Sequence, residues 1–260
     1  MDSTDRRPRT AAVLIIGNEV LSGRVRDANL QFLGARLRTI GIRVADCRVI
    51  PDDEAVIVSS VNEMRASHDY VFTTGGIGPT HDDITASSIA RAFEVPIEQN
   101  AEATRRLESY YRDAISAARL RMAQIPVGGE LLENPVSFAP GFRMENVYVL
   151  PGVPRIMQEM FDAFAGELQG GAPLLARTVT AFVSESEVAD PLRALQDEHE
   201  DVEIGSYPFL RGGRLGTALV ARGTDPAAIA AVASRLVEIV ESCGVTPDVA
   251  DGEVPMEFED

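Results

Sequence analysis

The chain contains no lysine: all 24 cationic side chains among its 260 residues are arginine. This absence excludes enzymes that form a Schiff base through lysine, carry a nucleotide on lysine, or hold phosphate with a P-loop lysine. The exclusive use of arginine indicates base-composition bias in the genome rather than chemistry. Any phosphate that binds here must be met by backbone N–H groups, arginine, hydroxyl groups or a metal ion.

Cysteine and long apolar runs are also scarce. Cys47 and Cys243 are the only cysteines, too few for a disulfide framework or a structural zinc site. Apolar runs such as "AAVLIIG" are far too short to span a membrane, and the start "MDSTDRRPRT" lacks the apolar stretch of a signal peptide. These features predict a cytoplasmic protein.

The excess of acidic residues excludes two classes of binding partner. With a net charge of −16 and no basic run to offset it, the chain repels nucleic acid and anionic membranes. We therefore expect no nucleic-acid partner and no membrane partner. The composition, 45% hydrophobic and 25% charged, is that of a globular protein, and the length fits one large domain or a medium and a small one.

The first part of the chain alternates strand and helix patterns. Short apolar runs predict strands, and apolar residues at helical spacing predict helices between them. The expected order is strand 11–16, helix 27–40, strand 42–50, helix 54–67 and strand 70–74. This order favours a mostly parallel sheet with right-handed crossovers and helices on both faces, a three-layer, Rossmann-like α/β fold.

The periodicity pauses near Gly170, where we expect a domain boundary. Before it, the patterns predict a charged helix over 98–122, an irregular loop or hairpin over 130–142, and a strand, Pro-Gly turn and helix over 146–164. After it, they predict a small α+β unit with strand 177–183, helix 187–198, strands 202–206 and 217–221, and helix 226–241. The predicted domains are residues 8–170 and 174–245, followed by an acidic tail at 246–260.

Polar segments follow three of the predicted strands: Gly17-Asn18-Glu19, Pro51-Asp52-Asp53 and the loop from Gly75 to Asp83. In open α/β sheets, ligands bind outside the carboxyl ends of the strands. The three segments are therefore predicted to face one crevice. The alternative for Asp52 and Asp53, and the first choice for that loop alone, is capping of the next helix.

The third segment belongs to the stretch "TTGGIGPTHDDIT" (73–85). Gly75, Gly76 and Gly78 can adopt positive φ and let backbone N–H groups converge on a small anion, helped by the positive end of the following helix. A tight strand-to-helix turn without a ligand is the alternative, and spacing alone does not separate the two. The loop is not a dinucleotide fingerprint, because the G-x-G-x-x-G spacing is absent.

Two acidic residues, Asp82 and Asp83, end this loop. Capping of the helix by Asp83 or Thr85 would explain one of them but not the second. Two carboxylates beside a phosphate cradle suit a divalent cation of the Mg²⁺ type that bridges to phosphate oxygens. His81 could join them, although a single histidine in a surface loop is usually without function.

The stretch "LPGVPR" (150–155) places Pro151 and Gly152 at the end of another strand and Arg155 in the first turn of a helix. Simple turn chemistry explains this pattern. The functional interpretation is a fourth loop over the same crevice, with Arg155 as a phosphate contact.

Together these stretches resemble a known family. "TTGGIGPTHDDIT" is similar to the signature loop of the molybdopterin-binding superfamily, which includes MoaB, MogA and the gephyrin G domain. "GNEVLSGRVRDANLQFLGARLRTIGI", "LLENPVSFAPGF" and "VYVLPGVPRIMQEMF" resemble the branch formed by the amino-terminal part of competence/damage-inducible protein A (CinA) and the equivalent part of eukaryotic FAD synthase. "IGSYPFLRGGRLGTALVARGTDP" resembles the small domain that follows in this branch, so the resemblance extends from Ala11 to Glu241.

Two departures from the branch stand out. Phe138 stands where the G-T-A-P-G segment of the branch has a small residue, and we expect this bulk to narrow or reshape the ligand pocket. The amidohydrolase domain of full-length CinA has no counterpart here, so deamidation of nicotinamide mononucleotide is not assigned.

The resemblance implies site residues position by position. Asp83 matches the aspartate of the glycine-rich loop, and Asp52 or Asp53 matches a second aspartate after the second strand. Glu19 matches the acidic residue after the first strand. Ligand contacts are expected from the loop and turn residues Gly17, Asn18, Glu19, Thr74, Gly75, Gly76, Gly78, Pro79, Thr80, Pro151, Gly152 and Arg155.

The resemblance also implies an activity. Members of the CinA branch are associated with hydrolysis of pyrophosphate bonds in ADP-ribose-like dinucleotides, whereas MogA-type members adenylylate molybdopterin. We therefore expect a nucleotide or pterin ligand and hydrolysis of a phosphoanhydride, as in ADP-ribose or FAD. A divalent metal (Mg, Mn or Co) would be held by Asp82 and Asp83, with Asp52 or Asp53 taking part. Adenylyl transfer and ligand binding without turnover are the alternatives, and a homo-oligomer, dimer or trimer, is expected by analogy with the fold.

Overall fold

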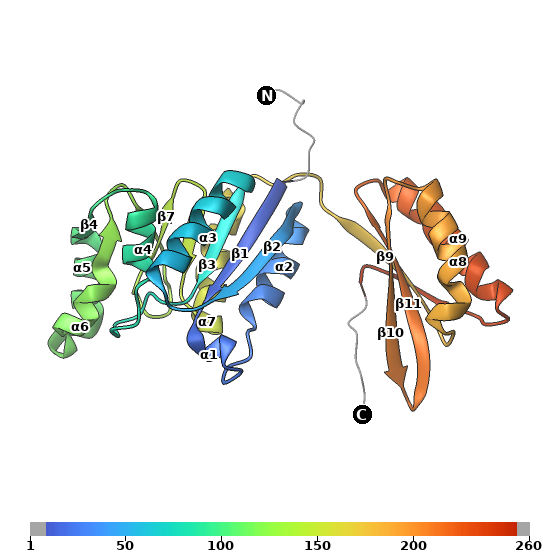
Figure 1. Ribbon diagram of the computed structural model, residues 1–260, viewed down its shortest axis with the longest axis horizontal. Coiled ribbons are helices and arrows are strands. Elements are labelled where there is room, and N and C mark those ends of the chain that lie inside the picture. The colour runs from blue at the N-terminus through green and yellow to red at the C-terminus, as the bar shows by residue number, and fades with distance from the viewer. Residues whose placement is uncertain (1–8, 254–260) are drawn as a thin grey trace, which may run out of the picture. The chain divides into compact units, whose positions relative to one another are not determined.

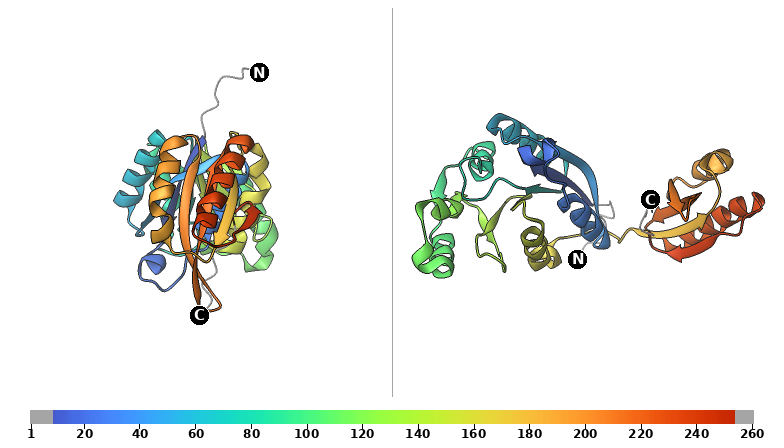
Figure 2. Two further views of the ribbon diagram at one scale, coloured as in Figure 1. Left: turned by 90° about the vertical axis from the view of Figure 1, so that its right-hand side faces the viewer. Right: turned by 90° about the horizontal axis from the view of Figure 1, so that it is seen from below.

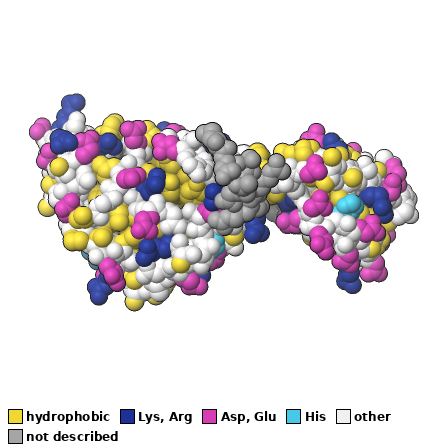
Figure 3. All heavy atoms as spheres, turned by 90° about the horizontal axis from the view of Figure 1, so that it is seen from above, with side chains coloured by type: hydrophobic (Ala, Val, Ile, Leu, Met, Phe, Trp, Pro, Cys, Tyr) yellow, Lys and Arg dark blue, Asp and Glu magenta, His cyan; other side chains and the backbone are white. Residues whose placement is uncertain are grey.

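The computed structural model describes residues 9–253 and divides the chain into two compact units, Met1–Gly171 and Ala172–Asp260 (Figure 1). The division falls within 170–173, where the sequence periodicity pauses. Acidic side chains are spread over the visible face of both units (Figure 3), in keeping with the net charge of −16. In the described part of the chain, no helix is both long enough and apolar enough to span a bilayer.

The first unit is built on a sheet of six strands in its described part. The order is β2-β1-β3-β8-β7-β6, with bounds β1 Arg9–Ile16, β2 Ile42–Ile50, β3 Tyr70–Thr74, β8 Val147–Leu150, β7 Gly141–Met144 and β6 Glu130–Leu132. The first four strands of that order run parallel, β7 is antiparallel to them, and β6 is antiparallel to β7 and so has the direction of the first four. The predicted mostly parallel α/β sheet is confirmed.

Helices cover both faces of this sheet. In β1, Val13 and Ile15 pack with helices α2 (Asn29–Thr39) and α7 (Pro154–Phe164), whereas Leu14 and Ile16 pack with α3 (Glu54–Ser67) and α4 (Thr85–Ala92). The view from below shows these helices on the two sides of the strands (Figure 2, right). A strand covered on both faces needs apolar residues at every position, which explains the uninterrupted run in β1.

The segment 98–122 differs from the single helix that was predicted. It begins in strand β4 (Ile97–Gln99), which pairs with β5 (Gln124–Pro126), and continues as helix α5 (Ala101–Tyr111), short 3-10 turns at 112–114 and 121–123, and helix α6 (Ala117–Leu120). Asn100 starts α5, because its side chain accepts from two backbone N–H groups. Arg112, with φ of 47°, ends it, so local capping divides a segment that composition alone makes uniformly helical.

The second unit has an antiparallel sheet with helices on one face. Its strand order is β10-β11-β9-β12, with bounds β9 Leu175–Ala181, β10 Glu203–Arg211, β11 Arg214–Gly223 and β12 Asp248–Asp251. Helices α8 (Glu185–Glu198) and α9 (Pro226–Ser242) supply the core with β9 and β11. Because β12 pairs with β9, part of the predicted acidic tail belongs to the folded unit, while 254–260 lie outside the described residues.

Candidate functional site

The carboxyl ends of the four parallel strands touch one another through their backbones. Gly17 N donates to Ile50 O at 3.1 Å, and Gly75 N donates to Leu150 O at 3.1 Å. A Cβ on Gly75 would lie 2.1 Å from Ile16 O, and one on Gly152 would lie 3.3 Å from the Cα of Gly75. The tips of β1, β2, β3 and β8 therefore meet at one place, as the strand-end rule requires.

Asp52 lies where the strand tips meet. Its carboxylate accepts from Asn18 N at 2.9 Å and thereby joins the ends of β2 and β1. Asn18 begins a one-turn helix, α1 (Asn18–Leu21), where the sequence predicted a loop. Glu19 is exposed and folds back over Gly17, where an added Cβ would lie 2.6 Å from its carboxylate oxygens.

Asp53 has a different environment. Its carboxylate accepts from Val56 N at 3.1 Å and so caps helix α3. Of the two adjacent aspartates, helix capping therefore accounts for Asp53 only, and Asp52 is the one that faces the neighbouring strand tip.

This assignment predicts a stability effect. Replacing Asp53 with alanine is expected to lower the free energy of unfolding by about 1 kcal/mol, because a Val56 N–H loses its acceptor. Replacement with asparagine, which keeps a side-chain oxygen, is expected to change stability by a few tenths of that. Urea unfolding followed by circular dichroism measures both, and equal stability of the alanine variant and wild type would contradict the capping role.

Asn29 is a site residue that sequence reasoning did not single out. It is 3% exposed, and its Nδ2 donates to Gly152 O at 3.0 Å, which holds the Pro151-Gly152 turn against α2. Its Oδ1 and the hydroxyls of Thr73 and Thr74 are buried without a hydrogen-bond partner in the part of the chain that is described. The D-x-N pattern was noted as part of the resemblance, but no local signal linked it to a turn far along the chain.

Two of the three loop glycines have the backbone conformation that was predicted. Gly75 and Gly76 have φ of 106° and 66°, whereas Gly78 lies outside the positive-φ region. Gly78 instead leaves room for Asp83, because an added Cβ would lie 2.7 Å from Asp83 Oδ2 and that side chain would have to move. Behind the loop, the buried Thr85 donates its N–H to Gly76 O and its hydroxyl to Gly75 O, each at 3.0 Å.

The loop leaves backbone donors available. The N–H groups of Gly76, Ile77 and Gly78 donate to no acceptor among the described residues. Groups of this kind at a turn between a strand and a helix form the concave surfaces that bind anions.

Asp83 does not cap helix α4. The residue before the helix is Ile84, and no side chain hydrogen-bonds to the first turn. Asp83 Oδ2 instead accepts from Thr80 N at 2.7 Å and from Thr80 Oγ1 at 2.6 Å. The alternative that the loop aspartate is a helix cap is therefore wrong for this residue.

Three side-chain oxygen atoms come together at the loop. Thr80 Oγ1 lies 2.5 Å from Asp82 Oδ1 and 2.6 Å from Asp83 Oδ2. A hydroxyl has one proton and can donate to one carboxylate at a time. The hydroxyl also holds the pKa of the Asp82 carboxyl below its usual value. Such an all-oxygen set is what a hard divalent cation binds.

The other acidic residues do not complete this set. Among residues 9–253, no group of three or more histidine, cysteine, aspartate or glutamate side chains is placed to hold a metal ion. His81 is 96% exposed, with Nδ1 3.9 Å from Asp82 Oδ1. A cation at the loop would therefore have two carboxylate ligands from the chain and would take its other ligands from water and a bound phosphate, as Mg²⁺ commonly does.

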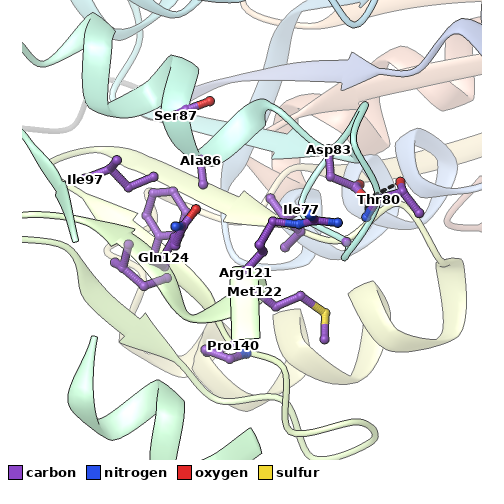
Figure 4. A pocket seen from close by; sticks show the side chains of 13 residues that line it. Ile77, Thr80, Asp83, Ala86, Ser87, Ile97, Arg121, Met122, Gln124 and Pro140 are labelled. Carbon is purple, nitrogen blue, oxygen red and sulfur yellow. Dashed lines mark hydrogen bonds between the residues drawn. The ribbon is translucent and has the colours of Figure 1, made fainter. Parts of the chain in front are cut away.

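A small cavity lies beside Asp83 (Figure 4). Gly78, Thr80 and Ser87 line it from the loop and α4, Arg121 lines it from the 3-10 turn before β5, and Gln124 lines it from the start of β5. Arg121 extends toward the Thr80–Asp83 turn and donates to Pro79 O. Of the acidic residues predicted to share one crevice, only Asp83 lines this cavity.

The volume of this cavity is about 60 Å³, far below the roughly 300–1,000 Å³ of small-molecule sites. A nucleotide would therefore occupy the open surface over the loop and place at most a small group inside. Phe138 does not line this cavity, and the expectation that it narrows or reshapes the ligand pocket stays a prediction. Neither Arg121 nor Gln124 carried a signal in the sequence, because both lie in segments without a motif.

The remaining predicted residues lie on the turn after β8. Pro151 and Gly152 form the turn held by Asn29, and Arg155 is exposed in the first turn of α7. Arg155 forms no ion pair with a described residue and is available to an anion.

Comparison with known proteins places both units. Residues 12–170 match the family described as a probable molybdopterin binding domain, and residues 173–248 match the middle domain of FAD synthase. The crystal structure of the protein CinA, of unknown function, from Thermoplasma acidophilum is 32% identical and superposes with a TM-score of 0.58, covering 61% of this chain and 97% of that one.

Curated proteins of archaea, a nematode and a bacterium are similar to most of the chain. A protein of Archaeoglobus fulgidus is 34% identical over 75% of this chain and 84% of its own length. A probable FAD synthase of Caenorhabditis elegans is 32% identical over 92% of this chain, and a CinA-like protein of Salinibacter ruber is 33% identical over 84%. The chain spans only 52% and 56% of these two proteins. On this evidence the chain belongs to the molybdopterin-binding domain family, in its CinA-like branch.

Proposed function

We propose that the chain binds a nucleotide or pterin pyrophosphate at the glycine loop and hydrolyses a phosphoanhydride of the ADP-ribose or FAD type with a divalent metal. The observation that carries the proposal is the loop itself. It combines the unpaired N–H groups of 76–78 with the oxygen atoms of Thr80, Asp82 and Asp83. The names of the worm relatives, probable FAD synthases, support a nucleotide-related role.

In this proposal Asp82 and Asp83 would hold a divalent metal, Mg²⁺, Mn²⁺ or Co²⁺. When bound, such an ion polarises a phosphoryl group and lowers the pKa of an attacking water. A bound cation would also offset the repulsion between the carboxylates and the phosphate.

Groups of the chain itself stabilise charge and position the carboxylates. The N–H groups of Gly76, Ile77 and Gly78 receive the negative charge of the transferred group. Thr80 positions Asp83 through its backbone N–H and donates its hydroxyl proton to either Asp82 or Asp83. Asp52 is the second aspartate of the proposal, since Asp53 is occupied in capping, and it fixes Asn18 at the edge of the site. Arg121, which reaches the loop, and the exposed Arg155 supply positive charge.

The proposal predicts a measurable product. The full chain is incubated with ADP-ribose or FAD and with Mg²⁺, Mn²⁺ or Co²⁺, and AMP is quantified by chromatography. We expect AMP to form in the presence of at least one metal and to disappear when EDTA is added. Binding of ADP-ribose without release of AMP under any of these metals would show a ligand-binding protein without turnover.

Adenylyl transfer to molybdopterin is a second candidate, favoured by the description of the family that matches the first unit. It predicts that ATP is consumed only after molybdopterin is added, which the same chromatography detects. The proposal also includes a homo-oligomer, dimer or trimer, which light scattering coupled to size-exclusion chromatography measures.

A further inference from the structure

An open groove lies on α5, away from the glycine loop. Arg105, Arg106 and Arg112 line it together with Tyr110 and Phe138. Its volume is about 620 Å³, within the range of roughly 300–1,000 Å³ found for small-molecule sites. None of the residues that line it lines the cavity beside Asp83.

The groove offers an aromatic surface. The rings of Tyr110 and Phe138 stack with their centroids 5.1 Å apart and an angle of 28° between the planes. Both side chains are 46% exposed, although aromatic rings of this size are usually buried. A stacked pair with an exposed face is suited to receive a third planar ring, such as a nucleobase, which stacks on aromatic side chains whatever its identity.

The Phe138 side of the groove is held in place by its loop. The buried Asn134 accepts from Val136 N and Ser137 N, each at 3.0 Å, and donates to Ala139 O at 2.7 Å. Phe138 N donates to Asn134 O at 3.2 Å. The ring is therefore presented by a hydrogen-bonded loop, which lowers the entropy lost when a ligand stacks on it.

Backbone strain coincides with the groove. Four non-glycine residues of the described chain have positive φ, and two of them, Arg112 at 47° and Phe138 at 60°, line this groove. A bulky residue in this region is an outlier, and such strain concentrates at ligand clamps. The strain accompanies the aromatic pair and the arginines; it does not define the site by itself.

The charge of the groove opposes that of the chain. Three guanidinium groups and the single carboxylate of Glu102 line it, on a protein of net charge −16. Glu102 pairs with Arg105 and with Arg106, whereas Arg112 forms no ion pair with any residue described. A ligand that satisfies this surface has a planar ring and an adjacent anionic group.

We propose that this groove is a second nucleotide-binding site, separate from the glycine loop. The base stacks on the Phe138–Tyr110 pair, and the phosphate groups meet Arg112 and Arg105. The site does not depend on the hydrolytic reaction and goes beyond it.

Isothermal titration calorimetry of the full chain with ADP in EDTA tests the proposal, with adenosine and inorganic pyrophosphate as separate probes. Phe138→Asn removes the ring but tolerates positive φ, and Arg112→Ala removes the unpaired charge. Each variant is expected to weaken one equivalent of ADP binding by about tenfold or more. Adenosine and pyrophosphate are each expected to bind at least about tenfold more weakly than ADP, because each lacks one of the two contacts.

Arg193→Ala is the matched control, since Arg193 is an exposed helical arginine of the second unit without an ion pair among the described residues. It is expected to bind ADP as wild type does. If the glycine loop binds no nucleotide, wild type is still expected to bind one ADP at the groove, and Phe138→Asn is expected to lose it. The experiment therefore tests the groove independently of the glycine loop. Unchanged ADP binding in both groove variants, or an altered oligomeric state with unchanged ADP binding, would overturn the second site.

Discussion

Replacing Gly75 with alanine is expected to lower the free energy of unfolding of the first unit by about 3 kcal/mol or more. Gly75 has φ of 106°, which disfavours any side chain, and an added Cβ would lie 2.1 Å from Ile16 O. That oxygen belongs to the buried end of β1 and cannot rotate away. The backbone of the loop or of β1 must shift, and the strand-tip contacts are lost with it.

Gly34→Ala serves as the matched control. Gly34 lies in helix α2, and an added Cβ would meet no atom within 4 Å. Since alanine is a better helix former, this variant is expected to gain about 0.5–1 kcal/mol.

Thermal unfolding followed by circular dichroism measures both glycine variants. A loss of 3 kcal/mol corresponds to a fall of roughly 6–12 °C in Tm for a unit of this size. A Gly75→Ala protein with the Tm of wild type would mean that the tips of β1 and β3 do not make the contact described.

Replacing Asp83 with asparagine is expected to lower the rate of AMP release by about a hundredfold or more, in the range found when a group acting directly on the reaction is removed. Asparagine keeps an oxygen that can accept from Thr80 N, so the loop retains its hydrogen bond. It loses the negative charge that the proposed metal requires. The expected result is a folded protein with wild-type Tm and little activity.

Two variants accompany Asp83→Asn. Thr80→Val removes the hydroxyl that lies between the two carboxylates, and it is expected to weaken metal binding by about tenfold. Asp190→Asn removes one exposed charge from α8 and is expected to leave AMP release unchanged. Equal AMP release by wild type and Asp83→Asn would show that the reaction takes place elsewhere on the chain.

Much of the fold was accessible from local patterns. The apolar run of β1 predicted a strand covered on both faces, and the spacing of Leu33 and Leu37 predicted α2. Prediction failed where a single residue ends a helix, and where a strand forms only because it pairs with a distant one. Asn100 and Arg112 set the two ends of α5 within a segment that reads as one helix, and residues 248–251 form a strand only because the edge of β9 is there to pair with them.

The candidate site, too, could be predicted only in part from the sequence. The motif between Gly75 and Asp83 identified the loop, but the roles within it depended on geometry. Asp53 caps a helix while its neighbour Asp52 reaches across to the first strand, and no sequence rule distinguishes two adjacent aspartates. Arg121 reaches the loop from a segment that has no motif.

The amino-acid sequence by itself determined the alternation of strands and helices between residues 11 and 74, the position of the glycine loop and the exclusion of lysine chemistry, because periodicity, glycine content and residue absence can be read from the chain without its tertiary contacts. Only the tertiary structure decided which side chains meet. Asn29 holds a turn 123 residues away, and Tyr110 stacks on Phe138 from a different segment. Such contacts depend on how the sheet and its connections bring distant segments together, and side-chain hydrogen bonds and ring stacking act only over a few ångströms.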